Sequence, residues 1–261
     1  MNFYIPISLI LFYMTFTSCQ EKSPGFAENK VIAHRGAWKA SGTPQNSIAS
    51  FREAVKLGCE GSEFDVWMTA DSVLVLNHDP DFQGIPVETS TYGDLLQNEL
   101  PNGEKIPTVE EFIKEGLKQS TTKLIFEIKP SRASKAHGLA LAEKSVQMVQ
   151  DLGAEKWVEY ISFDYDICLR VMELDPNAKV AYLRGDKTPE ELKDAGFYGF
   201  DYNIKVVRDN PEWIDKAKEL GLTVNVWTVN NADDMAWLLE KDVEFITTDE
   251  PELLFTLINQ Q

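Results

Sequence analysis

Acidic side chains recur at alternate positions in two β-rich stretches of the chain. Glu63 and Asp65 lie two residues apart, and Glu127 and Lys129 repeat that spacing further along. Side chains two apart on a strand point to the same face, so each pair is expected to face one way. Three carboxylates that converge repel one another unless a cation lies between them.

Carboxylate oxygens suit hard cations such as Mg²⁺ or Ca²⁺ rather than a soft metal. Glu63, Asp65 and Glu127 therefore predict a site for a divalent cation. The alternative for these residues is an internal ion pair, in which one of the carboxylates neutralises Lys129.

Two of the three histidines follow short apolar runs and adjoin charged residues. His34 stands before Arg35, and His78 stands before an aspartate. Imidazole is the side chain best suited to proton transfer near neutral pH, so we expect His34 and His78 to act as a general acid and a general base. The alternative is that each is a structural histidine. His137 is expected on the solvated surface.

Arg35 is a candidate ligand for an anionic substrate. Its guanidinium can hold a phosphate or a carboxylate with two hydrogen bonds. The alternative is an internal ion pair with Glu63 or Glu127. Gly36, the next residue, would allow the chain to turn sharply at this point.

The elements that must position these residues alternate between strand and helix from residue 30 to the end of the chain. Eight of these units in about 230 residues predict an α/β fold with a single (β/α)8 TIM barrel, and a doubly wound open sheet is the alternative. Strands are expected at 31–33, 61–66, 123–128, 158–162, 179–183, 199–202, 223–227 and 243–247. Helices are expected at 45–57, 109–118, 137–152, 165–174, 189–195, 211–220, 232–239 and 251–258.

The carboxyl ends of the strands in such a barrel carry the active site. The candidate residues above fall at these ends. Alternation along the seventh strand points Trp227 toward the barrel mouth, where it would form a wall of the substrate pocket, and Trp38 and Phe163 are candidates for the same opening. An extra strand is expected at 73–76. Residues 79–107 are expected to form a long loop without regular elements. This loop would be a short insertion after the second strand, and it would shape the leaving-group pocket.

Composition limits the kinds of partner that this chain can have. Its 261 residues include 42 Asp+Glu against 25 Lys+Arg, a net charge of −17. So acidic a surface repels nucleic-acid backbones, and we expect no nucleic-acid partner. A small anionic substrate would need a local basic or metal site. Three cysteines do not make a disulfide framework, and Cys59 and Cys168 are expected to be buried hydrophobic residues, with a bond between the two as the alternative. The sequence carries no signal for an oligomeric state.

The N-terminus has the features of a targeting segment. Residues 1–18 contain no charged side chain and end in small residues before Cys19. This resembles a bacterial lipoprotein signal peptide, although the usual basic residue near its start is missing. On this interpretation Cys19 is lipidated, residues 19–29 form a polar tether and residues 30–261 form the barrel domain. The alternatives are an ordinary cleaved secretory signal and a retained anchor helix.

The lipoprotein interpretation also predicts where the protein resides. We expect it in the bacterial cell envelope, held by its lipid on the periplasmic side or at the cell surface. Contact with the membrane would be through this N-terminal anchor only.

Six stretches of the chain occur in a recognisable order: VIAHRG, PQNSIASFREAVKLGCEGSEFDV, VLNHDP, FEIKP, NVWTVN and FITTDEP. In order and spacing they resemble the glycerophosphodiester phosphodiesterase family, and specifically a bacterial member of the lipoprotein type. Two departures stand out. Gln45 and Ser47 replace a glutamate and a threonine of the family pattern, so Gln45 is expected to cap the helix that starts there, and an Arg-Thr pair after the second histidine is absent.

The resemblance implies a phosphoric diester hydrolase. The family has a (β/α)8 barrel and a divalent metal, and it cleaves glycerophosphodiesters to sn-glycerol 3-phosphate and an alcohol. The matching residues imply these roles here: Glu63, Asp65 and Glu127 as metal ligands, His34 and His78 as general acid and base, and Arg35 and Lys129 as phosphate ligands. The alternatives are a barrel phosphodiesterase acting on inositol or choline phospholipids, and a non-catalytic lipoprotein that binds phosphorylated polyols.

Overall fold

The computed structural model describes Met1 and residues 24–260. The predicted lipidation site Cys19 and, Met1 apart, the predicted signal peptide lie outside these described residues. Across the described part of the chain, every helix is too short or too polar to cross a bilayer.

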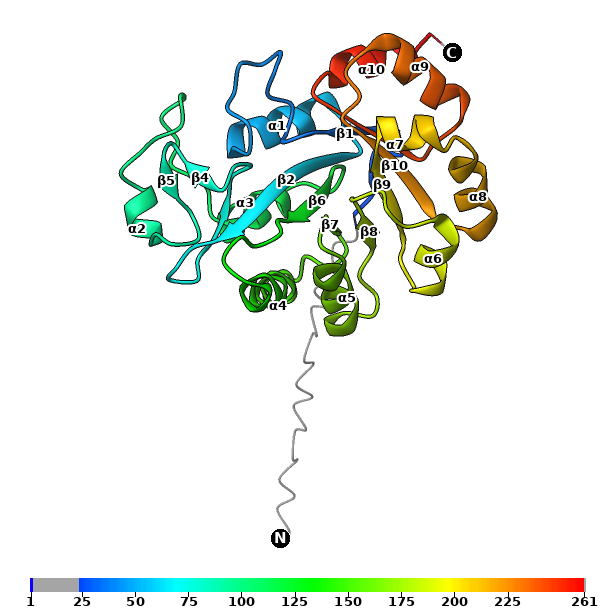
Figure 1. The fold of residues 1–261 in the computed structure, drawn as a ribbon. Coiled ribbons are helices and arrows are strands. Elements are labelled where there is room, and N and C mark those ends of the chain that lie inside the picture. Colours follow the sequence, from blue (N-terminus) through cyan, green and yellow to red (C-terminus); the bar gives the residue numbers. More distant parts are fainter. Residues whose placement is uncertain (2–23, 261) are drawn as a thin grey trace.

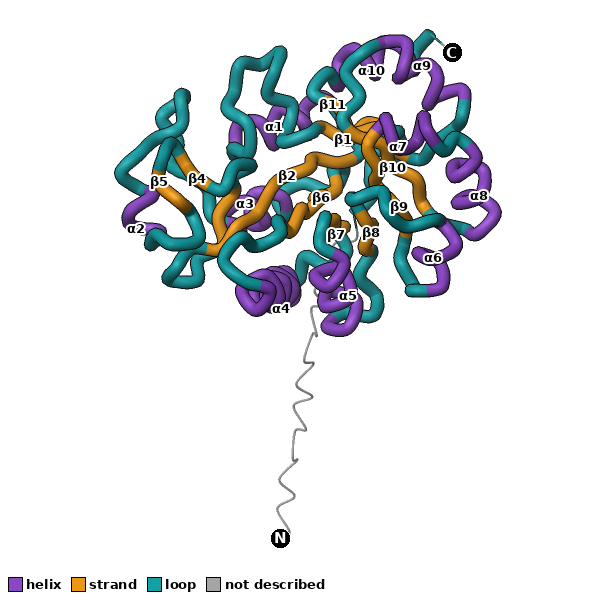
Figure 2. Tube along the Cα trace, in the orientation of Figure 1, coloured by secondary structure: helices purple, strands orange, loops and turns teal. Residues whose placement is uncertain are grey.

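Eight parallel strands close into a barrel (Figures 1 and 2). The closure is made by β1, which pairs in parallel with both β2 and the last strand, β11. The predicted (β/α)8 barrel is therefore confirmed. In their order around the barrel the strands are β1 (Val31–Ala33), β2 (Gly61–Met68), β6 (Lys123–Ile128), β7 (Val158–Ser162), β8 (Val180–Tyr182), β9 (Gly199–Asn203), β10 (Thr223–Trp227) and β11 (Phe245–Thr248).

Helices form the outer layer around the strands (Figure 1). Their boundaries differ from the predicted ones by a few residues, except that the sequence did not indicate α7 (Ile204–Asp209), a six-residue helix too short to show periodicity. The others around the barrel are α1 (Ile48–Leu57), α3 (Val109–Gly116), α4 (Lys135–Asp151), α5 (Tyr165–Leu174), α6 (Pro189–Asp194), α8 (Glu212–Leu220), α9 (Ala232–Glu240) and α10 (Pro251–Ile258).

The start of α1 corrects one prediction. Ser47, not Gln45, caps this helix: its hydroxyl accepts a hydrogen bond from the Ser50 amide at 3.0 Å. The Ser50 hydroxyl in turn accepts from the Ser47 amide at 3.3 Å, which completes a capping box. Gln45 lies before the helix and is free to reach the barrel mouth.

The insertion after β2 is more ordered than the predicted loop. It contains the expected strand β3 (Leu74–Leu76), which pairs antiparallel with β2, a two-stranded ribbon of β4 (Asp81–Phe82) and β5 (Ile85–Pro86), and the helix α2 (Tyr92–Leu95). Elements this short leave little periodicity in a sequence, which is why a loop was predicted. The insertion lies beside the barrel (Figure 1). A small core holds it together: Trp67, Val75, Phe82, Val87, Leu95 and Ile106.

The chain enters the barrel at the face where the strands begin. The Gly25 and Ala27 amides donate to the carbonyls of Ser120 and Thr121, just before β6, both at 2.9 Å. Lys123 closes the interior at this end. Its ammonium group lies 2.9 Å from a Glu60 oxygen and 3.1 Å from a Glu159 oxygen. The carboxyl ends of the strands therefore open on the opposite side of the molecule.

Candidate active site

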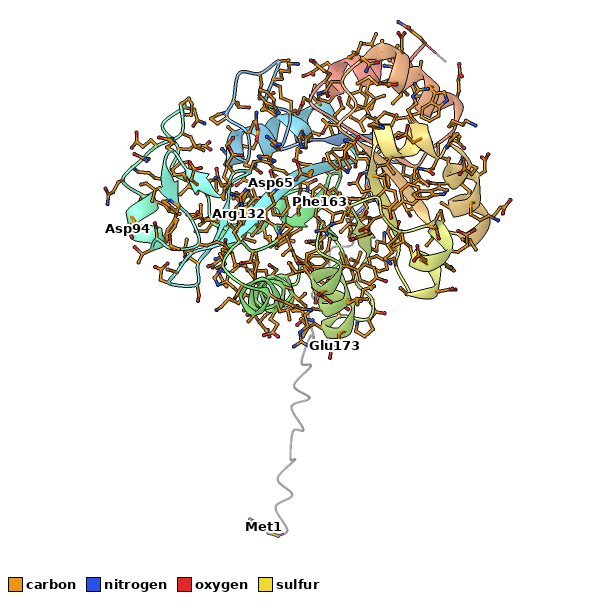
Figure 3. All side chains as sticks on the ribbon, viewed as in Figure 1. Met1, Asp65, Asp94, Arg132, Phe163 and Glu173 are labelled. Carbon is orange, nitrogen blue, oxygen red and sulfur yellow. The ribbon has the colours of Figure 1, made fainter. Side chains whose placement is uncertain are left out.

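A pocket of about 180 Å³ opens at the carboxyl ends of the strands. It brings together most of the residues that the sequence singled out. Asp65 is buried and is not part of the pocket lining, whereas Phe163 is; both side chains are labelled in Figure 3. The lining includes the predicted residues His34, Arg35, Glu63, His78, Glu127, Lys129 and Trp227.

Three carboxylates converge beside this pocket. One oxygen from each of Glu63, Asp65 and Glu127 lies within 4.8 Å of the others. All three side chains are buried, and Glu63 Oε1 has no hydrogen-bond partner among the described residues. Burial, followed by the charges of Asp65 and Glu127, raises the pKa of Glu63 well above its usual range. Burial and the charge of Asp65 raise the pKa of Glu127 to about 8.

Lys129 lies between two of these carboxylates. Its ammonium group is 2.8 Å from Asp65 Oδ1 and 2.8 Å from Glu127 Oε1. Burial alone would lower the pKa of Lys129, but the two carboxylates outweigh this and raise it. The same contact, with help from His78 and Arg35, keeps the pKa of Asp65 below its usual range despite its burial. The ion-pair alternative thus describes part of the cluster, while Glu63 stays outside it.

Asn46 fixes the orientation of Asp65. The Asn46 amide group donates to Asp65 Oδ2 at 2.8 Å, and the Asp65 amide donates to Asn46 Oδ1 at 3.0 Å. Sequence reasoning did not single out Asn46. It stands in the motif before α1, between Gln45 and the capping Ser47, so the motif carried the signal for a site residue rather than for a helix cap alone.

Arg35 is held by its backbone as well as its side chain. Its amide donates to Glu63 Oε2 at 2.8 Å, and its guanidinium donates to Gln45 Oε1 at 2.6 Å. The ion pair is made with Asp65, at 3.5 Å, rather than with the expected Glu63 or Glu127. The backbone of Arg35 is left-handed, with φ +56°. In this conformation the backbone amide points to Glu63 and the side chain extends to Asp65.

Each of the two pocket histidines has one ring nitrogen tied to an aspartate. His34 Nδ1 lies 2.8 Å from Asp249, and His78 Nδ1 lies 2.8 Å from Asp79. The Nε2 atom of each ring is therefore left to face the pocket. The distance from His34 Nε2 to Glu63 Oε2 is 4.0 Å. Burial lowers the pKa of His78, an effect that the charge of Asp65 partly offsets, and so favours the neutral imidazole.

The aspartate beside His34 was missed by the sequence analysis, although it stands in the quoted FITTDEP stretch. Asp249 also accepts from the Asn230 amide at 2.7 Å and from the Trp38 indole at 3.3 Å. Burial would raise the pKa of Asp249, but the hydrogen bond and charge of His34 lower it to about 2. Trp38 thus supports the site from behind instead of lining the pocket.

The third histidine is not the fully solvated residue that was predicted. His137 is partly buried. Its Nε2 lies 3.4 Å from the Met68 carbonyl and 3.6 Å from Glu88 of the insertion. The Ser131 hydroxyl donates to the same Glu88 carboxylate at 2.5 Å. These contacts tie the insertion to the start of α4.

An aromatic wall faces the charged groups across the pocket. The rings of Trp227 and Phe163 meet edge to face, with centroids 5.4 Å apart. The Trp227 indole donates to the Asp201 carbonyl at 2.9 Å, which fixes the plane of the ring. Phe163 was a candidate for the pocket lining, and the structure confirms that position for it.

Comparison with known proteins gives a consistent answer. The sequence pattern of the glycerophosphoryl diester phosphodiesterase family matches residues 34–253. A glycerophosphodiester phosphodiesterase of Caldanaerobacter subterraneus is 28% identical over 257 residues, which cover 88% of this chain and 98% of the relative.

Solved structures agree with the sequence comparison. The crystal structure of a glycerophosphodiester phosphodiesterase from Parabacteroides distasonis is 44% identical and superposes with a TM-score of 0.87, covering 90% of this chain and 99% of that one. A phosphodiesterase of Oleispira antarctica, solved in complex with the product sn-glycerol-3-phosphate, shares the fold at 22% identity and a TM-score of 0.73, covering 88% of this chain and 96% of that one.

Proposed function

Because this chain belongs to the glycerophosphoryl diester phosphodiesterase family, and so is a phosphodiesterase that hydrolyses glycerophosphodiesters, we propose that it forms sn-glycerol 3-phosphate and an alcohol with the aid of a divalent cation and two histidines. The observation that carries this proposal is the convergence of His34, His78 and the carboxylate cluster on one pocket. The product found in the Oleispira antarctica structure supports the same products here.

The carboxylate cluster fits a hard cation. Glu63, Asp65 and Glu127 supply buried oxygens within 4.8 Å of one another, and Glu63 Oε1 is left without a partner in the described chain. Oxygen ligands of this kind are those that Mg²⁺ and Ca²⁺ prefer. When bound, the cation supplies positive charge that stabilises the phosphate in the transition state.

The basic side chains bind and orient the phosphate in this proposal. Arg35 and Lys129 both line the pocket beside the carboxylates. Their charges offset the acidic field of the protein at the one place where an anionic substrate must bind. Trp227 then packs against the carbon skeleton of the substrate from the opposite wall.

The histidines move the protons. One imidazole takes a proton from the attacking hydroxyl, either of water or of the substrate's own glycerol. The other donates a proton to the oxygen of the departing alcohol. Each ring is held for this by its Nδ1 bond to an aspartate, so that Nε2 of both His34 and His78 serves as the reacting atom.

The pocket favours a soluble diester over an intact phospholipid. Its volume of about 180 Å³ lies below the usual range of ligand pockets, about 300–1,000 Å³. Two acyl chains have no room in such a space. The choline, ethanolamine, glycerol or inositol of a deacylated lipid can leave through the open rim.

The test is release of glycerol phosphate from glycerophosphocholine, glycerophosphoethanolamine, glycerophosphoglycerol and glycerophosphoinositol. Each substrate is assayed with Mg²⁺, with Ca²⁺ and with EDTA. We expect release that depends on the cation. Release that persists in EDTA would contradict the metal part of the proposal, and no release from any substrate would contradict the reaction.

We propose a cell-envelope location as well, with Cys19 lipidated. Only four residues separate Cys19 from Pro24, where the described chain resumes and passes under the face of the barrel opposite the pocket. An anchor there would turn the pocket away from the membrane, toward soluble substrates. Cys19→Ala should release the protein from the membrane fraction of the cell. Retention of this variant in the membrane fraction after signal cleavage would contradict the proposal.

A further inference from the structure

One oxygen of a buried carboxyl group on the far wall of the barrel has no hydrogen-bond partner in the described chain. Asp201 lies on β9, and its side chain is 2% exposed. Its Oδ1 has no hydrogen-bond partner among residues 24–260. Buried polar atoms are nearly always hydrogen-bonded, because an unpartnered one costs free energy. The catalytic scheme above gives Asp201 no task.

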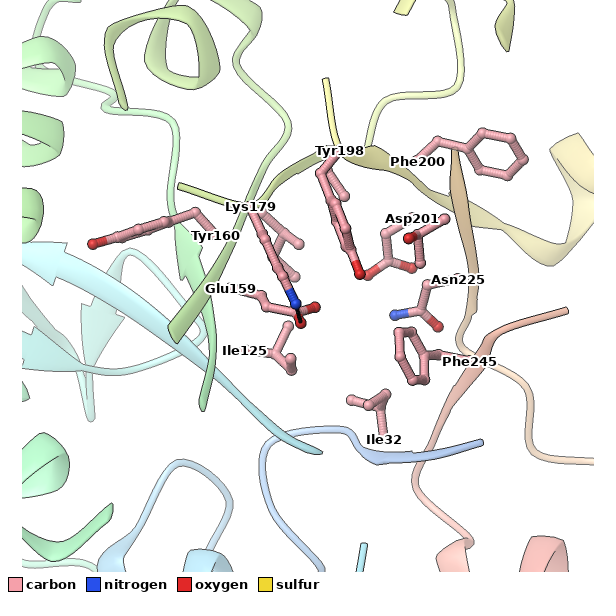
Figure 4. Close-up of a pocket in the computed structure, with 13 residues that line it drawn as sticks. Ile32, Ile125, Glu159, Tyr160, Lys179, Tyr198, Phe200, Asp201, Asn225 and Phe245 are labelled. Carbon is pink, nitrogen blue, oxygen red and sulfur yellow. Dashed lines mark hydrogen bonds and ion pairs between the residues drawn. The ribbon is translucent and has the colours of Figure 1, made fainter. Parts of the chain in front are cut away.

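Asp201 separates two spaces inside the barrel. Above it is the active-site pocket, and below it is a cavity of about 20 Å³. Figure 4 shows this lower cavity, with Asp201 and Asn225 on one side and Glu159 and Lys179 on the other. The lower cavity has space for about one water molecule. The upper pocket, at about 180 Å³, has room for part of a substrate.

The position of Asp201 relative to the charged groups is informative. In the order of the eight strands, β9 lies across the barrel from β2, which carries Glu63. Asp201 shares its side of the pocket with the aromatic pair, since the Trp227 indole donates to its carbonyl. A phosphate held at Lys129 therefore has its carbon skeleton directed toward Trp227 and Asp201.

Building on the proposed function, we propose that Asp201 recognises the glycerol moiety of the substrate by hydrogen bonds to its hydroxyl groups. The glycerol is common to all glycerophosphodiesters, whereas the esterified alcohol varies. A deep, buried wall is suited to the constant part, and the open rim is suited to the variable part. Burial and the charge of Glu127 outweigh a hydrogen bond from Asn225 and raise the pKa of Asp201, and the protonated form that this favours can both donate to and accept from hydroxyls.

Calorimetric titration with two small phosphates tests this assignment. The wild-type protein, with Mg²⁺ present, is titrated with sn-glycerol 3-phosphate and with propyl phosphate, which has the same chain length but no hydroxyl groups. The same titrations are repeated with Asp201→Leu, whose side chain has the same branching but cannot form hydrogen bonds. We expect the wild type to prefer glycerol phosphate, and the variant to lose about 10- to 100-fold of that preference with propyl phosphate bound as before.

Two further readouts separate recognition from a structural role. Asp201→Leu removes a buried carboxyl group whose Oδ1 has no partner in the described chain, so we expect its melting temperature to stay close to that of the wild type. Asp201→Asn, which retains a neutral hydrogen-bonding group, should keep most of the preference for glycerol phosphate. An equal loss for both phosphates, or an unchanged preference in Asp201→Leu, would overturn the assignment in favour of a water-bridged structural residue. Failure of the hydrolysis panel, by contrast, would refute the proposed reaction and leave the binding preference to be measured.

Discussion

His34 and Asp249 meet across the seam at which the barrel closes, with 2.8 Å between His34 Nδ1 and Asp249 Oδ1. The two residues are 215 positions apart in the chain. They are brought together by the parallel pairing of β1 with β11. The last βα unit therefore completes the site that the first unit begins, because the aspartate sets which ring nitrogen of His34 faces Glu63.

Asp249→Asn tests this relationship. The amide keeps the shape of the carboxylate but removes the charge that holds the ring, so we expect kcat to fall about 10- to 100-fold with KM nearly unchanged. The pKa of Asp249, lowered to about 2, keeps the wild-type group ionised throughout an ordinary assay range. Titration of Asp249 itself therefore cannot account for any change in the size of the effect between pH 5 and pH 8.

Asp242→Asn is the matched control for that variant. Asp242 is exposed at the opposite face of the barrel and has a left-handed backbone, φ +52°, that asparagine also adopts readily. Its kcat should equal that of the wild type. A rise in KM with kcat unchanged for Asp249→Asn would contradict a positioning role for Asp249.

The two pocket histidines should be separable from the third by alanine substitution. His34→Ala and His78→Ala each remove a proton-transfer group, so we expect kcat to fall about 10²- to 10⁴-fold. His137→Ala, a control of the same residue type, should stay within about twofold of the wild type because His137 lies outside the pocket lining. Wild-type kcat in either of the first two variants would remove that histidine from the mechanism.

The carboxylate cluster is tested by metal titration. Glu63→Gln replaces the one carboxylate of the cluster that Lys129 does not contact, so we expect the affinity of EDTA-treated protein for Mg²⁺ or Ca²⁺ to fall about tenfold or more. Glu110→Gln, on the exposed face of α3, should leave the affinity unchanged. Unaltered metal affinity in Glu63→Gln would assign that residue a structural role.

The barrel was predictable from the sequence because its strands and helices recur as regular, well-bounded units. The alternation of Glu63 with Asp65 and of Glu127 with Lys129 was enough to place those four residues on one rim. The insertion was not predictable as a folded unit. Its strands β4 and β5 are two residues long, and their stability depends on a core made with Trp67 of β2.

The contacts that the site residues make with one another could not be predicted from their spacing in the sequence either. Asp249 and His34 are neighbours only because the barrel closes, and Asp201 becomes unusual only when its surroundings are known to be buried. Gln45 was assigned to a helix by its position in a motif, whereas its actual contact is with Arg35. Local pattern shows which face a side chain occupies, but the tertiary pairing of strands decides what it meets.

An ion pair between α1 and α3 predicts a pH-dependent contribution to stability. The Arg52 guanidinium donates to Glu115 at 2.8 Å, and this hydrogen bond, together with one from Lys118 and although opposed by burial, lowers the pKa of Glu115 to about 2. A carboxyl whose pKa is lowered on folding stabilises the protein above its unfolded pKa, near 4.5, and loses that effect as pH falls toward 2.

Glu115→Gln should therefore destabilise the protein at pH 7 by about 0.5–1 kcal/mol, a value kept small by the exposure of Arg52. The difference from the wild type should shrink between pH 4.5 and pH 3 in urea or thermal unfolding. Glu110→Gln, whose ion pair lies within one helix, is the control for a generic loss of charge. A difference that stays constant down to pH 3 would contradict the ion-pair explanation.

The turn after Arg35 leaves little room for a side chain. Gly36 has φ +81°, and a Cβ added there would lie 2.4 Å from the Ser50 hydroxyl and 2.7 Å from the Ser50 backbone carbonyl carbon. Ser50 belongs to the capping box of α1, and its hydroxyl donates to the Arg35 carbonyl at 3.0 Å. Any shift of Ser50 therefore moves Arg35 and the backbone amide that holds Glu63.

Gly36→Ala should reduce both stability and activity, and Gly42→Ala separates the two causes of the effect. Gly42 has φ +71° but nothing within 4 Å of an added Cβ, so its variant carries the strain of a left-handed alanine, about 1–2 kcal/mol, without the clash. We expect Gly36→Ala to lose more unfolding free energy than Gly42→Ala, and to lose kcat/KM where Gly42→Ala keeps it. Equal losses in the two variants would show that backbone strain alone, and not contact with Ser50, explains the glycine at position 36.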